Sequence, residues 1–227
     1  MGFKIRTAIL HYKPLTERKA NIIKQMLNLG FENYFFYEDY DAENIDNNVI
    51  DKYYDRNMMP KKAKDAYGLQ INEIKDLNKR QMSLNMKFGK VFEIFSKFDD
   101  EYFLILEDDV LFCENFVEKF DDYFNRCPKD WDVIYMGNGA GLIPENVTSQ
   151  NNFYLKNCPS SKCSDSILLT KKALSDLNNT WFPFSLGSDF ELSYQHLIHN
   201  HKVYWWYPTL ITQGSQNGTY LSCFSNL

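Results

Sequence analysis

The sequence predicts an α/β fold, built on a mostly parallel sheet flanked by helices. Residues 102–106 are five consecutive large apolar side chains, which is typical of a strand buried on both faces of a parallel sheet. Residues 5–37 contain a strand, an amphipathic helix and a second strand, which predicts a parallel pair joined by a right-handed crossover. No linker-like stretch divides the 227 residues, so we expect one domain over residues 1–227.

Local signals define the first elements. Residues 5–10 are predicted as a strand, and Thr16 is expected to cap a helix that runs to residue 29 and ends at Gly30. One stripe of this helix is apolar and is expected to face the core: Ile22, Ile23, Met26 and Leu27. Residues 34–37 are predicted as the second strand.

The middle of the chain begins with a polar stretch, residues 39–68, which we expect to be an extended loop with short helical pieces. An amphipathic helix is then indicated by apolar residues at helical spacing: Leu84, Phe88, Val91, Phe92 and Phe95. Beyond the apolar strand, another helix is predicted that ends before Pro128. Residues 131–136 are predicted as a strand that runs into a glycine-rich turn, whose spacing does not match a dinucleotide-binding motif.

The last third is predicted to contain a strand at residues 166–170, a short helix, and a further helix with a recognisable start. Ser188 and Glu191 match the capping-box pattern, which would make Asp189 the first helical residue. Residues 203–207 form a strongly aromatic strand pattern. Three histidines are interpreted as structural or surface residues in preference to a zinc site: His196, His199 and His201.

Composition limits the function. The net charge of −5 and the lack of a basic stripe argue against nucleic-acid binding. No apolar run approaches 18 residues, and the first ten are too polar for a signal peptide, so we expect no membrane span and a cytoplasmic protein. Five scattered cysteines suit a reducing compartment, and we expect free thiols at positions 113, 127, 158, 163 and 223.

Three adjacent carboxylates, Glu107, Asp108 and Asp109, follow the apolar strand. Two unit charges about 5 Å apart repel by roughly 3 kcal/mol at an effective dielectric constant of about 20, so this cluster favours a divalent counter-ion. In an extended chain Glu107 and Asp109 point to the same side and can share a metal. Open α/β sheets bind ligands at the carboxyl ends of their strands. The alternative is a polar strand end followed by a turn.

Other residues are candidates for the same site. His11, Tyr12 and Arg18 follow the first predicted strand, and Arg18 is placed to meet a phosphate, although a surface arginine is the common alternative. Ser83 and Lys87 share one helix face, where they are either donor contacts or solvent-facing. Three tryptophans suit either sugar stacking or core packing: Trp181, Trp205 and Trp206.

Several segments, in this order, resemble glycosyltransferase family 25, which contains lipopolysaccharide glycosyltransferases and collagen galactosyltransferases. The resembling segments are residues 15–18, SLNMK at 83–87, YFLILEDDV at 102–110, WDVIYMG at 131–137, Ser188-Asp189 and PTLITQGS at 208–215. The resemblance implies a GT-A-like, Rossmann-like fold, a UDP-sugar donor, Mn²⁺ and inverting transfer. It also implies that residues up to about 110 hold the donor and residues from about 111 the acceptor. Phe88 stands where family members usually have histidine.

By the same resemblance, Glu107 and Asp109 would hold the metal, Asp108 would contact the nucleotide, and Asp189 would be the acceptor's base. Together with the residue chemistry, this predicts a glycosyltransferase that uses Mn²⁺ or Mg²⁺ and moves galactose or glucose from a UDP-sugar to a hydroxyl of a glycan or protein acceptor. The alternatives are a metal-dependent nucleotidyl- or phosphotransferase and a non-catalytic carbohydrate-binding protein. The sugar, the acceptor and the oligomeric state are left open by the sequence.

Overall fold

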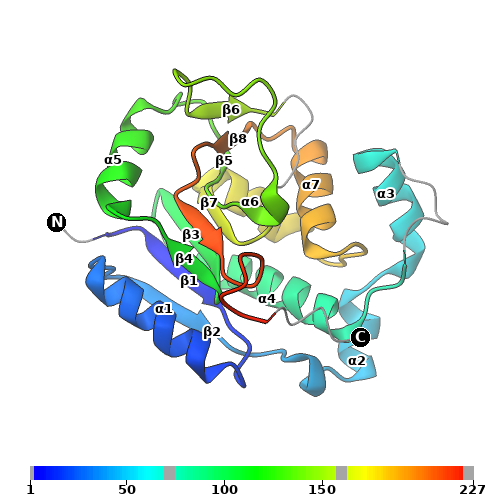
Figure 1. The fold of residues 1–227 in the computed structure, drawn as a ribbon. Helices are drawn as coiled ribbons and strands as arrows, with labels where there is room; N and C mark the ends of the chain where they lie inside the picture. Colours follow the sequence, from blue (N-terminus) through cyan, green and yellow to red (C-terminus); the bar gives the residue numbers. More distant parts are fainter. Residues whose placement is uncertain (1–2, 69–74, 157–162, 222–227) are drawn as a thin grey trace.

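The computed structural model describes residues 3–68, 75–156 and 163–221. Within them one sheet runs through both halves of the chain (Figure 1). Its strands are β1 (Arg6–Leu10), β2 (Tyr34–Tyr37), β3 (Tyr102–Glu107), β5 (Val133–Tyr135), β6 (Phe153–Leu155), β7 (Ser166–Thr170) and β8 (Val203–Trp206). A separate two-stranded ribbon pairs β4 (Val110–Phe112) with β9 (Ile211–Gln213).

The helices are α1 (Thr16–Asn28), α2 (Asn47–Tyr53), α3 (Met59–Tyr67), α4 (Lys79–Phe95), α5 (Phe116–Arg126), α6 (Lys171–Thr180) and α7 (Ser188–Ile198). Short 3-10 turns lie at Ala42–Asn44, Arg56–Met58 and Gly139–Gly141. No helix among the described residues has the length and apolar content needed to cross a membrane.

The sheet has the strand order β2-β1-β3-β7-β5-β8-β6. Strands β2, β1, β3, β5 and β8 run in one direction, and β7 and β6 run against them. The predicted mixed α/β architecture with a mostly parallel sheet is therefore confirmed, as is the parallel β1–β2 pair. The reversal at β7 matters for the site, because it brings the start of β7 beside the carboxyl end of β3.

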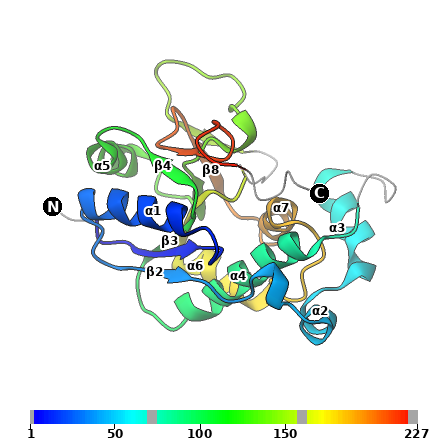
Figure 2. The ribbon, with the colours of Figure 1, turned by 60° about the horizontal axis from the view of Figure 1, so that its bottom comes forward.

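Helices cover both faces of the sheet (Figure 2). On one face, Phe103 and Ile105 of β3 pack in a core cluster with apolar residues of α4 and α6. On the other, Leu104 and Leu106 pack in a cluster with residues of α1 and α5. Successive side chains of β3 thus enter opposite cores, which explains why the strand is apolar without alternation.

The start of α1 differs from the prediction. Leu15 precedes the helix, no side chain caps it, and Thr16 is the first helical residue. A turn in which the Leu15 N–H donates to the Tyr12 carbonyl, at 2.9 Å, carries the chain into the helix and leaves Thr16 inside its first turn. The apolar stripe is also narrower than expected, because Leu27 is 64% exposed.

The region predicted as an extended loop with short helical pieces, residues 39–68, contains two short helices, α2 and α3. The nine-residue α3 ends at Gly68, whose φ of +66° is a left-handed conformation suited to glycine. Met59 and Ala63 pack against Leu186 and Tyr194, which are more than 120 residues away in sequence. Two apolar positions make too weak a periodic signal for prediction, and tertiary contacts with α7 stabilise the helix.

Candidate active site

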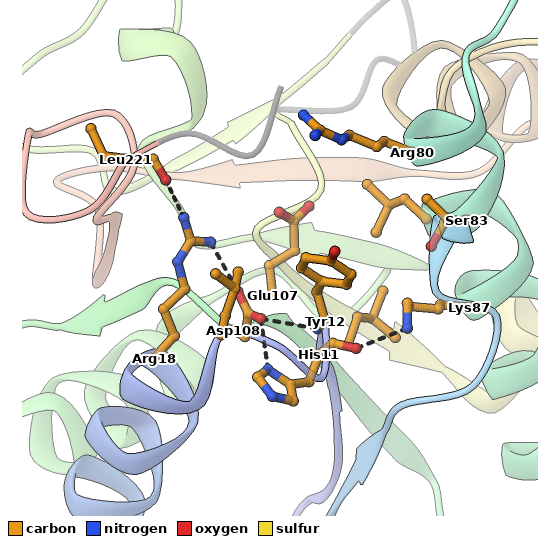
Figure 3. A pocket seen from close by; sticks show the side chains of 13 residues that line it. His11, Tyr12, Arg18, Arg80, Ser83, Lys87, Glu107, Asp108 and Leu221 are labelled. Carbon is orange, nitrogen blue, oxygen red and sulfur yellow. Dashed lines mark hydrogen bonds and ion pairs between the residues drawn. The ribbon is translucent and has the colours of Figure 1, made fainter. Parts of the chain in front are cut away.

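A cavity of about 280 Å³ lies at the carboxyl ends of β1 and β3, between α1 and α4 (Figure 3). It is lined by Leu10, His11, Tyr12, Leu15, Arg18, Ala42, Arg80, Ser83, Leu84, Lys87, Glu107, Asp108 and Leu221. Parallel strands end at the same edge of a sheet, so residues that follow β1 and β3 meet there. Seven of the nine predicted site residues therefore lie around one cavity, and Asp109 and Asp189 lie outside its lining.

Asp108 connects the end of β1 to α1 by hydrogen bonds on one side of the cavity. Its carboxylate is 2.7 Å from His11 Nδ1 and accepts the Tyr12 backbone N–H at 3.2 Å. Arg18 Nη1 donates to its other oxygen at 3.1 Å, and both side chains are only 8% exposed. The charge of Asp108 is thus offset by a buried guanidinium, which indicates that Asp108 orders the wall and orients Arg18.

On the opposite side of the cavity, the Lys87 ammonium group is likewise hydrogen-bonded to other parts of the protein. Its ammonium group donates to the carbonyls of His11 and Asp39 at 2.8 Å and to Asp41 Oδ1 at 2.7 Å. These three acceptors account for its three protons. Burial lowers the pKa of Lys87, while the hydrogen bond to Asp41 opposes that shift. Lys87 therefore ties the 39–41 segment to the end of β1.

The pocket face of α4 also includes a residue that the sequence analysis did not single out. Arg80 lies at the mouth of the cavity, one turn before Ser83 and two before Lys87 (Figure 3). The Ser83 hydroxyl donates to the Tyr40 carbonyl at 2.6 Å. The i, i+3, i+7 spacing placed Arg80 on the same face, so the signal was available in the sequence.

Glu107 and Asp109 have a different environment from Asp108. The pKa of Glu107 is raised well above its ordinary value, first by burial and then by the charge of Asp109. Burial likewise raises the pKa of Asp109, whereas a hydrogen bond from Ser215 lowers it. Ser164 Oγ donates to Glu107 Oε1 at 2.5 Å, and Asp109 Oδ1 is buried without a hydrogen-bond partner among the described residues. Both carboxylates are thus held where ionisation is disfavoured.

The start of β7 supplies a further buried carboxylate, Asp165, which was not predicted. Because β7 is antiparallel to β3, the Glu107 N–H donates to the Asp165 carbonyl at 2.9 Å. The Asp165 side chain is 0% exposed and packs directly on Gly137, where any Cβ atom would collide with it. The glycine that ends the β5 segment is therefore required by a close approach of Asp165 to the backbone.

Asp189 is the second residue of α7 and lies outside the cavity lining. Burial raises its pKa to about 6, with an opposing contribution from a hydrogen bond with Ser164. Its charge contributes to the raised pKa of Glu107, and Ser164 Oγ is 3.4 Å from Ser188 Oγ. Ser164 therefore links Glu107 to the start of α7.

The predicted capping box is wrong. Gly187 precedes α7, and no side chain makes a capping hydrogen bond. Ser188 is the first helical residue, which moves Asp189 to the second position. Glu191 turns into the interior and accepts the backbone N–H groups of Ser185 and Leu186 at 3.0 and 3.1 Å. A buried ion pair with Lys62, absent from the local pattern, decides its orientation.

Glu107 and Asp109 suit a divalent cation that takes only a few of its ligands from the protein. No group of three or more His, Cys, Asp or Glu side chains within residues 3–68, 75–156 and 163–221 has the arrangement of a complete metal cage. Glu107 and Asp109 offer hard oxygen donors, and the buried Asp109 Oδ1 is one of them. Mg²⁺ is commonly held by one or two carboxylates, with water and substrate phosphates completing its shell. The donor set fits such a site.

The other candidates are structural where they are described. Trp181, Trp205 and Trp206 are at most 5% exposed and belong to the two main cores, so they pack and do not present a face to a sugar. The histidines of α7 and its exit form a buried network: His196 is 2.7 Å from the Tyr135 hydroxyl and 3.1 Å from His201. Cysteines 113, 127 and 163 are free thiols, and positions 158 and 223 lie outside the described residues.

No family model and no curated protein matches the chain. Weak likenesses to solved structures include A197 from STIV (12% identity, 91% of this chain and 83% of that one, TM-score 0.45). The inositol-1-phosphate CTP transferase from T. maritima is another (15% identity, 94% and 90% covered, TM-score 0.44). Mouse xyloside xylosyltransferase 1 in its apo form is a third (10% identity, 88% and 84% covered, TM-score 0.41). At these scores the likenesses leave activity to be inferred from the residues of the chain itself.

Proposed function

We propose that this chain is a metal-dependent inverting glycosyltransferase that moves galactose or glucose from a UDP-sugar to a hydroxyl of a glycan or protein acceptor. One observation carries the proposal. A single cavity brings the Arg18 guanidinium and the Glu107 carboxylate together at the carboxyl ends of two parallel strands, with Asp189 just beyond Glu107. A guanidinium group and a metal-binding carboxylate would neutralise the charge of a diphosphate. The Asp189 carboxylate would accept the proton of the acceptor hydroxyl.

The donor would lie along the cavity. Apolar contacts from Leu10, Leu15 and Leu84 suit the flat face of a nucleobase, and Arg18 is oriented by Asp108 toward a phosphate oxygen. Glu107 and Asp109 would hold Mn²⁺ or Mg²⁺, which supplies stabilisation of the charge that develops on the leaving diphosphate. Once their carboxylates are ionised, the repulsion that raises the pKa of Glu107 is offset by the cation.

The acceptor would approach from the side of α7. Its hydroxyl oxygen forms a bond to the anomeric carbon as the bond from that carbon to the UDP oxygen breaks. Asp189 takes the hydroxyl proton. A carboxyl group with a pKa of about 6 is mostly ionised at neutral pH, and it is a stronger base than an ordinary aspartate. An inverting displacement requires the base on the side of the sugar opposite to the diphosphate, and Asp189, outside the cavity lining, would take that place.

UDP titrations by calorimetry, with and without Mn²⁺, test the site. We expect binding that depends on Mn²⁺ and slow release of UDP from at least one UDP-sugar. Hydrogen exchange should show protection by UDP and Mn²⁺ near His11, Tyr12 and Glu107. Release of pyrophosphate from a nucleotide substrate would favour a nucleotidyltransferase instead, and binding without turnover would favour a carbohydrate-binding role.

A further inference from the structure

Glu191 and Lys62 form an ion pair inside the protein. Lys62 Nζ donates to Glu191 Oε1 at 2.6 Å, and the two side chains are 6% and 0% exposed. A neighbouring pair on the same helix, Lys61 with Asp65, is 61% and 40% exposed. Burying two charges carries a desolvation cost that further hydrogen bonds must offset, so the other contacts of the buried pair show what it holds in place.

Those contacts go to the segment that leads into α7. Glu191 Oε2 accepts the backbone N–H groups of Ser185 and Leu186, at 3.0 and 3.1 Å. Lys62 Nζ also donates to the Pro183 carbonyl, at 3.1 Å. The pair therefore fixes three backbone groups within four residues, and Asp189 follows three residues after the last of them.

The rest of this segment is held by elements on its other sides. Asn85 of α4 donates to the Leu186 carbonyl at 3.1 Å. Phe184 accepts from the Asp55 N–H at 2.9 Å and donates to the Tyr53 carbonyl at 3.0 Å. Glu191 attaches the segment to α7 by hydrogen bonds, and Leu186 also packs against Tyr194 of the same helix. The Lys62–Glu191 pair therefore couples the position of α4 and the 53–55 backbone to the first turn of α7.

We propose that Lys62 and Glu191 are positioning residues for Asp189. The inference rests on the proposed function, in which Asp189 takes the acceptor proton. The pair fixes where the first turn of α7 lies relative to Glu107, and a displacement of about 1 Å in a reacting group can lower a rate by about 100-fold. The helix α3, from which no described residue lines the cavity, is then required for turnover.

The main variant is Lys62→Met/Glu191→Gln, which removes both charges together and leaves neither one buried alone. We expect the rate of UDP release from a UDP-sugar with Mn²⁺ to fall about 10- to 100-fold. The affinity for UDP and Mn²⁺, measured by calorimetry, should stay within about threefold, because the cavity contacts are untouched. Lys61→Met is the matched control on the same helix and should change neither quantity.

The same substitutions in an Asp189→Asn background separate positioning from general damage. If the pair acts through Asp189, they should cause no further fall in rate, since the group they position is already gone. A further fall of the same size would overturn the proposal. Hydrogen exchange gives a reading that needs no turnover: the amides of Ser185 and Leu186 should exchange faster in the double variant, and unchanged protection would also overturn the proposal. A wild-type protein that neither binds UDP nor turns over a UDP-sugar would instead overturn the proposed function.

Discussion

The three adjacent carboxylates that follow the apolar run of β3 have two different environments. Asp108 is surrounded by cationic and hydrogen-bonding partners, with Arg18 Nη1 at 3.1 Å and His11 Nδ1 at 2.7 Å. Burial raises the pKa values of Glu107 and Asp109, its neighbours in sequence, and the charge of Asp109 raises that of Glu107 further. The three adjacent acidic residues thus differ: Asp108 is hydrogen-bonded to Arg18, whereas Asp109 is 3.7 Å from the same guanidinium and keeps a raised pKa, as does Glu107.

This division follows from the end of β3, because the strand ends at Glu107 and Asp108 and Asp109 form the turn into β4. Asp108, in the turn, contacts Arg18 of α1, whereas Glu107, the last residue of the strand, contacts Ser164 before β7. The side with α1 offers an arginine at the start of a helix. The side with β7 offers the hydroxyl of Ser164 and the carboxylate of Asp165, which adds to the raised pKa of Glu107. Because Asp108 and Glu107 contact different partners, we expect the acidic residues to have separate roles, and single substitutions can test each role.

The largest effect is expected for Asp189→Asn. As the loss of a general base, it should lower turnover by about 10²- to 10⁴-fold. Affinity for UDP with Mn²⁺ should stay within about threefold, because Asp189 neither lines the cavity nor is one of the two carboxylates assigned to the metal. Steady-state rates and calorimetry on the same preparation measure both. An enzyme that transfers sugar at the normal rate after this change would remove Asp189 from the mechanism.

Asp108→Asn and Asp109→Asn compare the two kinds of carboxylate directly. Asp108→Asn leaves the buried Arg18 without its main partner and should lower the free energy of unfolding by about 3 kcal/mol. Asp109→Asn should not lower the stability of the metal-free protein, because it removes a charge that burial disfavours. It should instead abolish Mn²⁺-dependent UDP binding. Urea unfolding without metal measures the first contrast, and equal losses of stability in the two variants would contradict the division.

The pH dependence of the free energy of unfolding tests whether Asp189, like Glu107, is a buried carboxylate with a raised pKa. The folded-state pKa of Asp189 is raised from 3.8 to about 6, so its protonated form is favoured in the folded protein. Its contribution to stability is fully present below pH 3.8 and is lost as the pH rises through about 6. Relative to Asp189→Asn, the wild type should therefore lose at most about 3 kcal/mol over that interval. Melting temperatures of both proteins from pH 4 to 8, in a chelator, test this; a constant difference would count against a buried Asp189.

The sequence predicted the parts of the fold that depend on local pattern. The run 102–106 and the apolar spacing of α4 specify a buried strand and a helix without reference to the rest of the chain. Ligands bind at the carboxyl ends of parallel strands, which predicts His11, Arg18 and Glu107 at one site, and in the structure all three line one cavity. Their roles in binding stay predictions.

Contacts between distant segments explain what the sequence did not reveal. Glu191 fits a capping box as a pattern, but its buried partner Lys62 lies 129 residues away, on a helix with little periodicity of its own. Asp165 is a single acidic residue before a strand, and only the antiparallel pairing of β7 with β3 brings it to Glu107. A local pattern specifies neither the partner nor the pairing.

The smallest effect is expected for Ser188→Ala, and it tests the corrected start of α7. A true capping serine would cost about 0.5–2 kcal/mol when replaced by alanine. Here Ser188 is inside the helix, and its hydroxyl has a long contact of 3.4 Å with the Ser164 hydroxyl. The free energy of unfolding should therefore change by less than about 0.5 kcal/mol.

The chain offers a matched control in Thr170, whose hydroxyl accepts the Ala173 N–H at 3.2 Å and caps α6. Thr170→Ala should show the full loss of about 0.5–2 kcal/mol in the same urea titration. The two alanine variants remove similar hydroxyl groups at the starts of two helices, so the comparison isolates the capping bond. Equal losses would mean that Ser188 stabilises α7 as a cap after all, and that Asp189 starts the helix as the sequence pattern predicted.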